Sequence, residues 1–239
     1  MRIFSDYYEA GSEVLRDLSE MGVITRIQSM QDKTDLDDDL AITKEVIGYS
    51  FTVLTHDRLD DMLELFRKVP LRVAKDYIDA EFADRISGEP LNPGNAWQLR
   101  AETWAEFLGK QGGKKMSYTY PERYHDRLEN VVAELKRNPG TRQAIHDVYR
   151  GDLDMQNWGG KKRIPCSILY QFFVRQGALH ILYFIRSNDL LEHFCYDMAL
   201  TGRYQEYVAE RLSLPVGDLI YMTGSLHAYK KDLDERGIF

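Results

Sequence analysis

Two side chains that can act together in nucleophilic chemistry lie 20 residues apart: Cys166, directly after Pro165, and Arg186, directly before Ser187. A thiol beside a guanidinium suggests an activated nucleophile next to an anion-binding site, because a fixed positive charge favours the reactive thiolate. A small core residue is the alternative, and is the more common role of a single cysteine in an apolar strand. The rest of the pattern must decide between the two interpretations.

The residues between Cys166 and Arg186 are predicted to form a β-hairpin that brings the two side chains together. Apolar and aromatic residues fill 164–174 and 178–185, and Gln176 and Gly177 between them are typical of a tight turn. The second strand would return Arg186 toward Cys166.

The other elements are predicted from hydrophobic periodicity and from the residues that begin and end helices. Helices are expected at 7–21, 60–67, 72–86, 96–108, from 121 to the turn at 138–140, and at 189–212, and strands at 41–54 and 218–229. No repeat or linker divides the chain. Residues 1–239 are therefore expected to form a single α+β domain, a mixed β-sheet flanked by helices.

Four further polar residues follow the hairpin at defined spacings: Asp189, Asp197, His227 and Tyr229. Together with the Pro-Cys and Arg-Ser pairs, they resemble the signature of the thymidylate synthase superfamily, which is Pro-Cys, Arg-Ser-x-Asp, an Asn or Asp on the next helix, and His-x-Tyr. Within this superfamily the chain is most similar to the phage deoxycytidylate hydroxymethylases, through RSND at 186–189, the Asp at 197, GSLHAY at 224–229 and YIDAE at 77–81. The resemblance implies a thymidylate synthase-like fold.

The resemblance also implies a covalent mechanism on a pyrimidine nucleoside monophosphate. Cys166 would add to C6 of the base, which makes C5 nucleophilic toward the one-carbon unit of 5,10-methylenetetrahydrofolate. Glu81 would order and activate water and relay protons, although a solvated helix face explains this residue almost as well. Tyr120 would lie near the nucleophile, and Tyr118 is the alternative for that role.

Asp197 carries the prediction of the substrate base. A carboxylate can only accept hydrogen bonds, and O4 of uracil is also an acceptor, so the two groups could not form a hydrogen bond. It can accept from N4 of cytosine if a proton is shared between the acid and N3, and this proton also activates C6. The alternative is a helix-surface or capping aspartate, which the register with the other motif residues disfavours.

The phosphate site implied by the resemblance uses Arg186 and Ser187, since a guanidinium can bind a phosphate dianion in a bidentate manner. In the family, two arginines after an Asn-Pro turn reach across from the other subunit. NPGTRQ at 138–143 supplies Arg142 but has Gln143 in the second place, so one charge is missing. A homodimer with shared active sites is therefore expected.

His227 and Tyr229 lie two residues apart on a predicted strand, so both face the same side, and the resemblance implies that they bind ribose hydroxyls. Asp189 matches the pterin-binding acid. Trp104 resembles an aromatic wall of the folate pocket, and a core tryptophan is the competing interpretation. His193 replaces a residue that is usually glycine in the family, so the backbone near the pterin is expected to differ.

Composition excludes several other classes of protein. The net charge of −7 argues against non-specific nucleic-acid binding, which needs a basic surface, so no obligatory nucleic-acid partner is expected. The short basic run 161–163 is expected to be a solvated loop, and the alternative is that it raises the local potential for an anionic substrate. No apolar run is long enough to span a membrane, and the start is not a secretory signal, so a cytoplasmic protein is expected, or one in the host cytoplasm if a phage encodes it. The two cysteines show no metal-ligand spacing, so no metal is expected.

These observations predict a pyrimidine nucleotide 5-hydroxymethyltransferase. It would convert dCMP or CMP, methylenetetrahydrofolate and water to the 5-hydroxymethyl nucleotide and tetrahydrofolate. One alternative is a thymidylate synthase variant that methylates dUMP. The other is a non-catalytic homologue that binds nucleotides or RNA.

Overall fold

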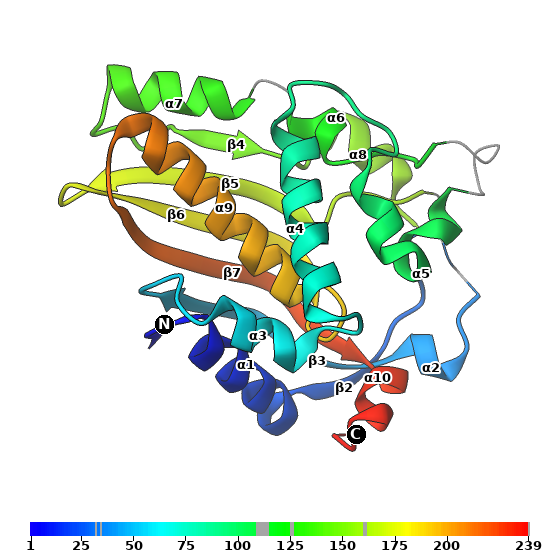
Figure 1. Ribbon diagram of the computed structural model, residues 1–239. Coiled ribbons are helices and arrows are strands. Elements are labelled where there is room, and N and C mark those ends of the chain that lie inside the picture. Colours follow the sequence, from blue (N-terminus) through cyan, green and yellow to red (C-terminus); the bar gives the residue numbers. More distant parts are fainter. Residues whose placement is uncertain (32, 34, 109–114, 125–126, 160–161, 239) are drawn as a thin grey trace.

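A mixed β-sheet forms the centre of the molecule in the computed structural model, which describes residues 1–31, 33, 35–108, 115–124, 127–159 and 162–238 (Figure 1). Its strands are β1 (Arg2–Phe4), β2 (Val23–Arg26), β3 (Ile42–Val53), β4 (Ile145–Asp147), β5 (Ser167–Arg175), β6 (Ala178–Asp189) and β7 (Val216–Tyr229). The spatial order is β1-β3-β7-β6-β5-β4, with β2 also paired to β3. The pairs β1–β3 and β6–β7 are parallel and the others are antiparallel.

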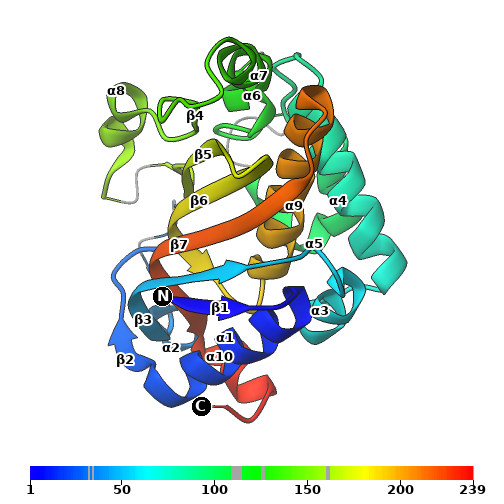
Figure 2. The ribbon, with the colours of Figure 1, turned by 90° about the vertical axis from the view of Figure 1, so that its left-hand side faces the viewer.

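The longer helices gather over one face of this sheet, as Figures 1 and 2 show together. They are α1 (Tyr7–Met21), α3 (Leu59–Phe66), α4 (Leu71–Ile86) and α9 (Phe194–Leu212). The amphipathic helix α1 packs on β3, α9 packs on β6 and β7, and α4 packs against α9. Helix α7 (Arg127–Arg137) packs against α9. Shorter helices are α2 (Asp38–Ala41), α5 (Ala101–Trp104), α6 (Pro121–Tyr124), α8 (Gly151–Asp154) and α10 (Lys230–Glu235). The expected α+β fold is confirmed.

Strands β5 and β6 form the predicted hairpin. Gln176 and Gly177 both have positive φ, 52° and 78°, which suits the tight turns that a twisted hairpin favours. Cys166 directly precedes β5, and its carbonyl accepts the backbone N–H of Arg186 at 2.8 Å. Strand β7 approaches closely here, because a Cβ on Gly224 would lie only 2.8 Å from the carbonyl oxygen of Arg186. The hairpin therefore places the thiol and the guanidinium beside one another.

Two predicted helices differ from the structure. The helix expected at 189–212 begins at Phe194, because Asp189 ends β6 and its carboxylate accepts the N–H groups of Leu191 and Glu192 at 3.1 and 3.2 Å. The helix expected at 96–108 is divided into 3₁₀ turns on either side of α5. The division falls at Arg100, whose backbone leaves the helical region (φ −135°, ψ 50°).

The short strands β1 and β2 were not predicted. Three and four residues are too few for an alternating pattern to be recognised. Among the described residues, no helix is both long enough and apolar enough to cross a membrane.

Candidate active site

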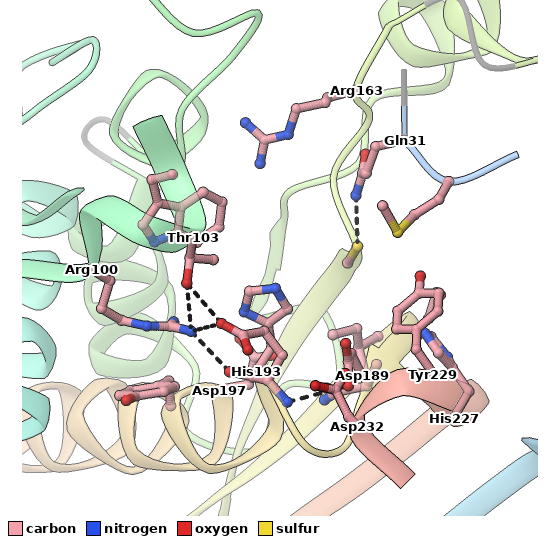
Figure 3. A pocket seen from close by; sticks show the side chains of 18 of the residues that line it. Gln31, Arg100, Thr103, Arg163, Asp189, His193, Asp197, His227, Tyr229 and Asp232 are labelled. Carbon is pink, nitrogen blue, oxygen red and sulfur yellow. Dashed lines mark hydrogen bonds and ion pairs between the residues drawn. The ribbon is translucent and has the colours of Figure 1, made fainter. Parts of the chain in front are cut away.

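A cavity of about 750 Å³ opens where β6, β7 and the start of α9 meet the segment before β5 (Figure 3). Most of the residues predicted from the sequence line it: Trp104, Tyr120, Cys166, Arg186, Ser187, Asp189, Asp197, His227 and Tyr229. Three others, Glu81, Arg142 and Gln143, are not among its lining residues. The fold thus gathers side chains from six separate segments of the chain around one cavity.

Cys166 is partly exposed at this cavity rather than sealed in the core. Its sulfur lies 3.7 Å from an Nη atom of Arg186 and 3.5 Å from the amide nitrogen of Gln31. The Arg186 guanidinium is held in place because its Nε donates to the Pro165 carbonyl at 2.9 Å. A positive charge is therefore fixed beside the sulfur, as an activated thiol requires.

Asp197 faces the same cavity from the first turn of α9. Burial raises the pKa of its carboxyl from 3.8 to about 7, against the opposing effect of Arg85 and Arg100, and Glu81 adds to the rise. Close to neutral pH this acid therefore exists in both its protonated and its ionised form. It can donate a hydrogen bond in one form and accept in the other.

This raised pKa gives a prediction for stability. Because the folded protein holds the Asp197 proton up to about pH 7 and the unfolded chain releases it near pH 4, this carboxyl lowers stability as pH rises between those values. Each pH unit in this window costs about 1.4 kcal/mol. We expect Asp197→Asn, which carries no charge, to gain in melting temperature relative to the wild-type protein as pH rises from 5 to 8.

Thermal melts of both proteins at a series of pH values measure this difference. The exposed Asp152 provides a control, since Asp152→Asn is expected to show no comparable change with pH. A difference between Asp197→Asn and the wild-type protein that stays constant from pH 5 to 8 would contradict the raised pKa.

Glu81 lies just behind the cavity, one helical turn before Arg85 on α4. Nε of Arg85 donates to the Glu81 carboxylate at 2.6 Å, and another of its nitrogens donates to the Tyr204 hydroxyl at 3.1 Å. The buried guanidinium also packs against the ring of Tyr120 at 4.0 Å. The hydroxyl of Tyr120 in turn lies 3.2 Å from Oγ of Ser167, next to the nucleophile. Glu81 is thus connected to the cavity through Arg85 and Tyr120.

His227 and Tyr229 lie on the same side of β7, as their spacing predicted, with ring centroids 5.4 Å apart. Nδ1 of His227 is 3.2 Å from Oγ of Ser225, which donates a hydrogen bond to Glu45. Burial lowers the pKa of His227 to about 4, although Glu45 opposes the shift. At neutral pH the imidazole is therefore uncharged and suited to hydrogen bonding with hydroxyl groups.

Asp189 stands at the floor of the cavity near the acids Asp232 and Glu192. Burial raises the pKa of Asp189 to about 7, with further contributions from these two acids and an opposing one from Lys68. Nζ of Lys68 pairs with Asp232 at 2.6 Å and with Glu192 at 2.9 Å. Asp189 therefore forms no ion pair of its own within the described part of the chain and can keep a proton near neutral pH.

Trp104 and His193 form an aromatic wall beside this acid, with ring centroids 5.5 Å apart. Burial lowers the pKa of His193 to about 3, and Arg100 adds to the effect, so the ring is uncharged at neutral pH. Trp104 lines the cavity and also packs against the hydrophobic core. It therefore combines the two positions considered for it, the wall of a pocket and the core. The histidine occupies the place expected for a glycine and adds a second ring to the wall.

Arg142 and Gln143 lie on the surface just before β4. The carbonyl of Arg142 accepts a hydrogen bond from Gln171 at 2.7 Å, which fixes its backbone. Its role in the active site of a second subunit remains a prediction.

Gln31, Arg85 and Arg163 are among the cavity residues that were not assigned a site role from the sequence. Gln31 is far from Cys166 in the chain, and Arg85 is one of several charged residues on α4. The expectation that the basic run 161–163 is solvated is wrong for Arg163, which is only 7% exposed. Lys161 lies outside the described residues. The signal in the sequence was the place of Arg163 in a basic run, three residues before Cys166.

Among the described residues there is no group of three or more His, Cys, Asp or Glu side chains arranged to hold a metal ion. The mixed sheet, with a thiol, a fixed guanidinium and a buried acid around one cavity, has the architecture of the thymidylate synthase fold. The solved structure of the thermostable thymidylate synthase A from Bacillus subtilis has this fold and superposes with a TM-score of 0.68 at 17% identity, covering 98% of this chain and 83% of that chain.

The comparison of sequences agrees with the fold. The family model described as thymidylate synthase matches residues 81–236, and the chain belongs to this family. It is 27% identical over 165 residues to a putative thymidylate synthase from Methanosarcina barkeri, covering 66% of this chain and 72% of that protein. It is 29% identical over 138 residues to the thymidylate synthase of Buchnera aphidicola subsp. Acyrthosiphon pisum, covering 55% of this chain and half of that protein.

Proposed function

We propose that the protein is a pyrimidine nucleotide 5-hydroxymethyltransferase. Its substrates are dCMP or CMP, 5,10-methylenetetrahydrofolate and water, and its products are the 5-hydroxymethyl nucleotide and tetrahydrofolate. The observation that carries the proposal is Asp197, an acid with a pKa of about 7 that faces the same cavity as Cys166. A cytosine ring needs an acceptor for its N4 amino group and a proton near N3, and an acid half-ionised near neutral pH supplies both.

Cys166 is the nucleophile in this proposal. Its thiolate adds to C6 of the base, the C5–C6 double bond opens, and electron density moves to C5. The proximity of Arg186 to the sulfur, 3.7 Å, supports this role because it places a fixed cation beside the attacking atom. Protonation at N3 by Asp197 makes C6 more electrophilic in the same step.

Glu81 and Tyr120 handle the proton that must leave C5. Arg85 contacts both side chains, so the carboxylate, the guanidinium and the phenol form one connected group beneath the cavity. Tyr120 and Arg85 line the cavity, and Glu81 exchanges the proton through water from behind them. Loss of this proton allows the bond between the one-carbon unit and tetrahydrofolate to break, which leaves a methylene group on C5. Water, delivered by the same route, then adds to this methylene group, and the thiolate of Cys166 leaves C6 as the C5–C6 double bond re-forms.

The residues of the cavity fit a folate. Trp104 and the neutral His193 offer aromatic surface, and Asp189, which is partly protonated near neutral pH, can donate or accept a hydrogen bond at a heterocycle. When bound, methylenetetrahydrofolate supplies the one-carbon unit that C5 receives. The protein's own contribution is to hold the two ring systems together and to control where water enters.

The nucleotide phosphate is proposed to bind at Arg186 and Ser187, and the ribose at His227 and Tyr229. A homodimer is part of the proposal, with Arg142 and Gln143 reaching the phosphate of the partner's site. Its support is that both side chains are exposed. Apolar side chains are exposed on the sheet as well, among them Ile47, Ile145 and Met222, which a second subunit would cover.

The experiment that tests this function uses dCMP, CMP and dUMP labelled with tritium at C5. Each is incubated with the protein and methylenetetrahydrofolate, and tritium release is followed together with the mass of the nucleotide product. Release from a cytidine nucleotide with a gain of one CH₂O unit is the expected result. The absence of release from all three nucleotides would overturn the proposal in favour of a non-catalytic homologue.

A thymidylate synthase variant is the second candidate, because the relatives compared above carry that name. The same experiment separates the two functions. A methylated product from dUMP, rather than a hydroxymethylated cytidine nucleotide, would identify the variant.

A further inference from the structure

Arg163 is a buried cation at the cavity wall for which the proposed reaction has so far given no role. It belongs to the segment just before β5, and Figure 3 shows its side chain extending into the cavity toward the side on which Thr103 lies. The guanidinium packs against three aromatic rings. Its central carbon lies 4.1 Å from the ring centroid of Phe107, 5.1 Å from that of Tyr118 and 5.3 Å from that of Trp104. These rings fix its position, since a guanidinium is attracted to aromatic faces.

The hydrogen-bonding capacity of Arg163 is largely unused. Nε and one Nη atom are buried and have no hydrogen-bond partner among the described residues. A guanidinium has five N–H donors, and burying a charged donor without an acceptor is unfavourable. Aromatic faces compensate for only part of this cost, because they accept no conventional hydrogen bond. An acceptor that enters the cavity with a ligand would satisfy these donors.

Four other cations of the cavity already have hydrogen-bond acceptors. Arg100 donates to Glu192 at 2.6 Å, Arg85 to Glu81 at 2.6 Å, and Lys68 to Asp232 at 2.6 Å. Arg186 is held by backbone carbonyls next to the thiol. Arg163 differs from these four in packing against three aromatic rings while two of its buried nitrogens have no acceptor among the described residues.

We propose that Arg163 binds the p-aminobenzoylglutamate half of the folate co-substrate, which carries an aromatic ring, an amide carbonyl and carboxylates. This inference rests on the proposed function. The nucleotide phosphate is assigned to the Arg186 side, so the acceptor on the Trp104 and Phe107 side belongs to the second reactant. A planar guanidinium among aromatic rings can stack on the benzoyl ring and donate to its oxygen substituents.

The test measures equilibrium binding by titration calorimetry in wild-type protein and in Arg163→Met. Three probes are used: tetrahydrofolate, 6-methyltetrahydropterin, which lacks the p-aminobenzoylglutamate half, and CMP. We expect Arg163→Met to weaken the binding of tetrahydrofolate about tenfold or more, because a charge-assisted hydrogen bond is lost. Binding of 6-methyltetrahydropterin and CMP is expected to stay within about twofold of wild type.

Two controls distinguish a role of Arg163 in folate binding from a role in the fold. Arg163→Lys retains the charge without the planar fork, so it should recover only part of the affinity for tetrahydrofolate. The melting temperature of ligand-free Arg163→Met should not fall, because an unpaired buried charge has been removed. A marked fall would mean that Arg163 serves the fold, and would overturn the inference.

The remaining outcomes are equally decisive. Weaker binding of CMP instead of tetrahydrofolate would assign Arg163 to the nucleotide and overturn the inference, as would unchanged binding of all three probes. Failure of the proposed function is detected separately, by the absence of tritium release in the wild-type protein. Binding is measured without turnover, so the two failures do not resemble one another.

Discussion

Replacing Cys166 with serine is expected to reduce tritium release from C5 of the nucleotide by about 10³-fold or more. A serine hydroxyl is far less nucleophilic than a thiolate, and the neighbouring guanidinium of Arg186 cannot ionise it at neutral pH. The Kd for CMP should change little, since the side chains proposed to hold the phosphate and ribose are retained. Release is measured in single-turnover reactions and the Kd by calorimetry.

The second cysteine of the chain supplies a matched control. Cys195 is 1% exposed, and burial raises the pKa of its thiol to about 12, so it is an inert core residue. Cys195→Ala should therefore keep tritium release near the wild-type rate, and iodoacetamide should label Cys166 but not Cys195. If Cys166→Ser retained the wild-type rate, covalent catalysis by this residue would be excluded.

The part of the site that was predictable from the sequence lies on one hairpin and its neighbouring strand. A tight turn at Gln176–Gly177 fixes the register of most of β5 and β6 and returns the end of β6 to the start of β5. A one-residue shift in the pairing between Ser167 and Leu169 then brings Arg186 beside Cys166. Likewise, two residues at i and i+2 on a strand must share a face, which places His227 beside Tyr229. Local geometry of this kind is encoded in spacing.

The part that was not predictable depends on packing between distant segments. Arg163 is buried because Trp104 and Phe107 are brought against it from a segment some 60 residues earlier in the chain. Arg100 interrupts its own helix where its guanidinium pairs with Glu192 and packs 4.0 Å from the ring of Tyr196. Charge and sequence position are the same for a solvated arginine and a buried one, so only tertiary structure separates the two.

The position of Glu81 shows why a motif match and a site can differ in detail. The YIDAE segment forms part of α4 as expected, and yet the carboxylate lies behind the cavity, paired with Arg85. An arginine at i+4 on a helix reaches its acidic partner whether the pair is solvated or buried. Here the side chain of Arg85 is 4% exposed, so the pair is an internal connection to Tyr120 and not a solvated helix face.

Replacing Asp197 with asparagine is expected to change which base the protein accepts. The ratio of kcat/KM for dCMP to that for dUMP should fall by about 10²-fold or more. An amide offers a donor to O4 and an acceptor to N3–H of uracil, whereas cytosine would lose the proton that the acid shares with N3. The ratio is obtained from tritium release with the two nucleotides at concentrations below KM.

Asp189→Asn is the matched control for this experiment, because Asp189 is the second acid of the cavity whose pKa burial raises to about 7. Asp189 is proposed to contact the folate, so its replacement should lower kcat/KM for both nucleotides by a similar factor and leave their ratio unchanged. An unchanged ratio in Asp197→Asn would remove the basis for base recognition by this carboxyl. A change of equal size in both variants would mean that the charge of the cavity, and not a contact to the base, sets the preference.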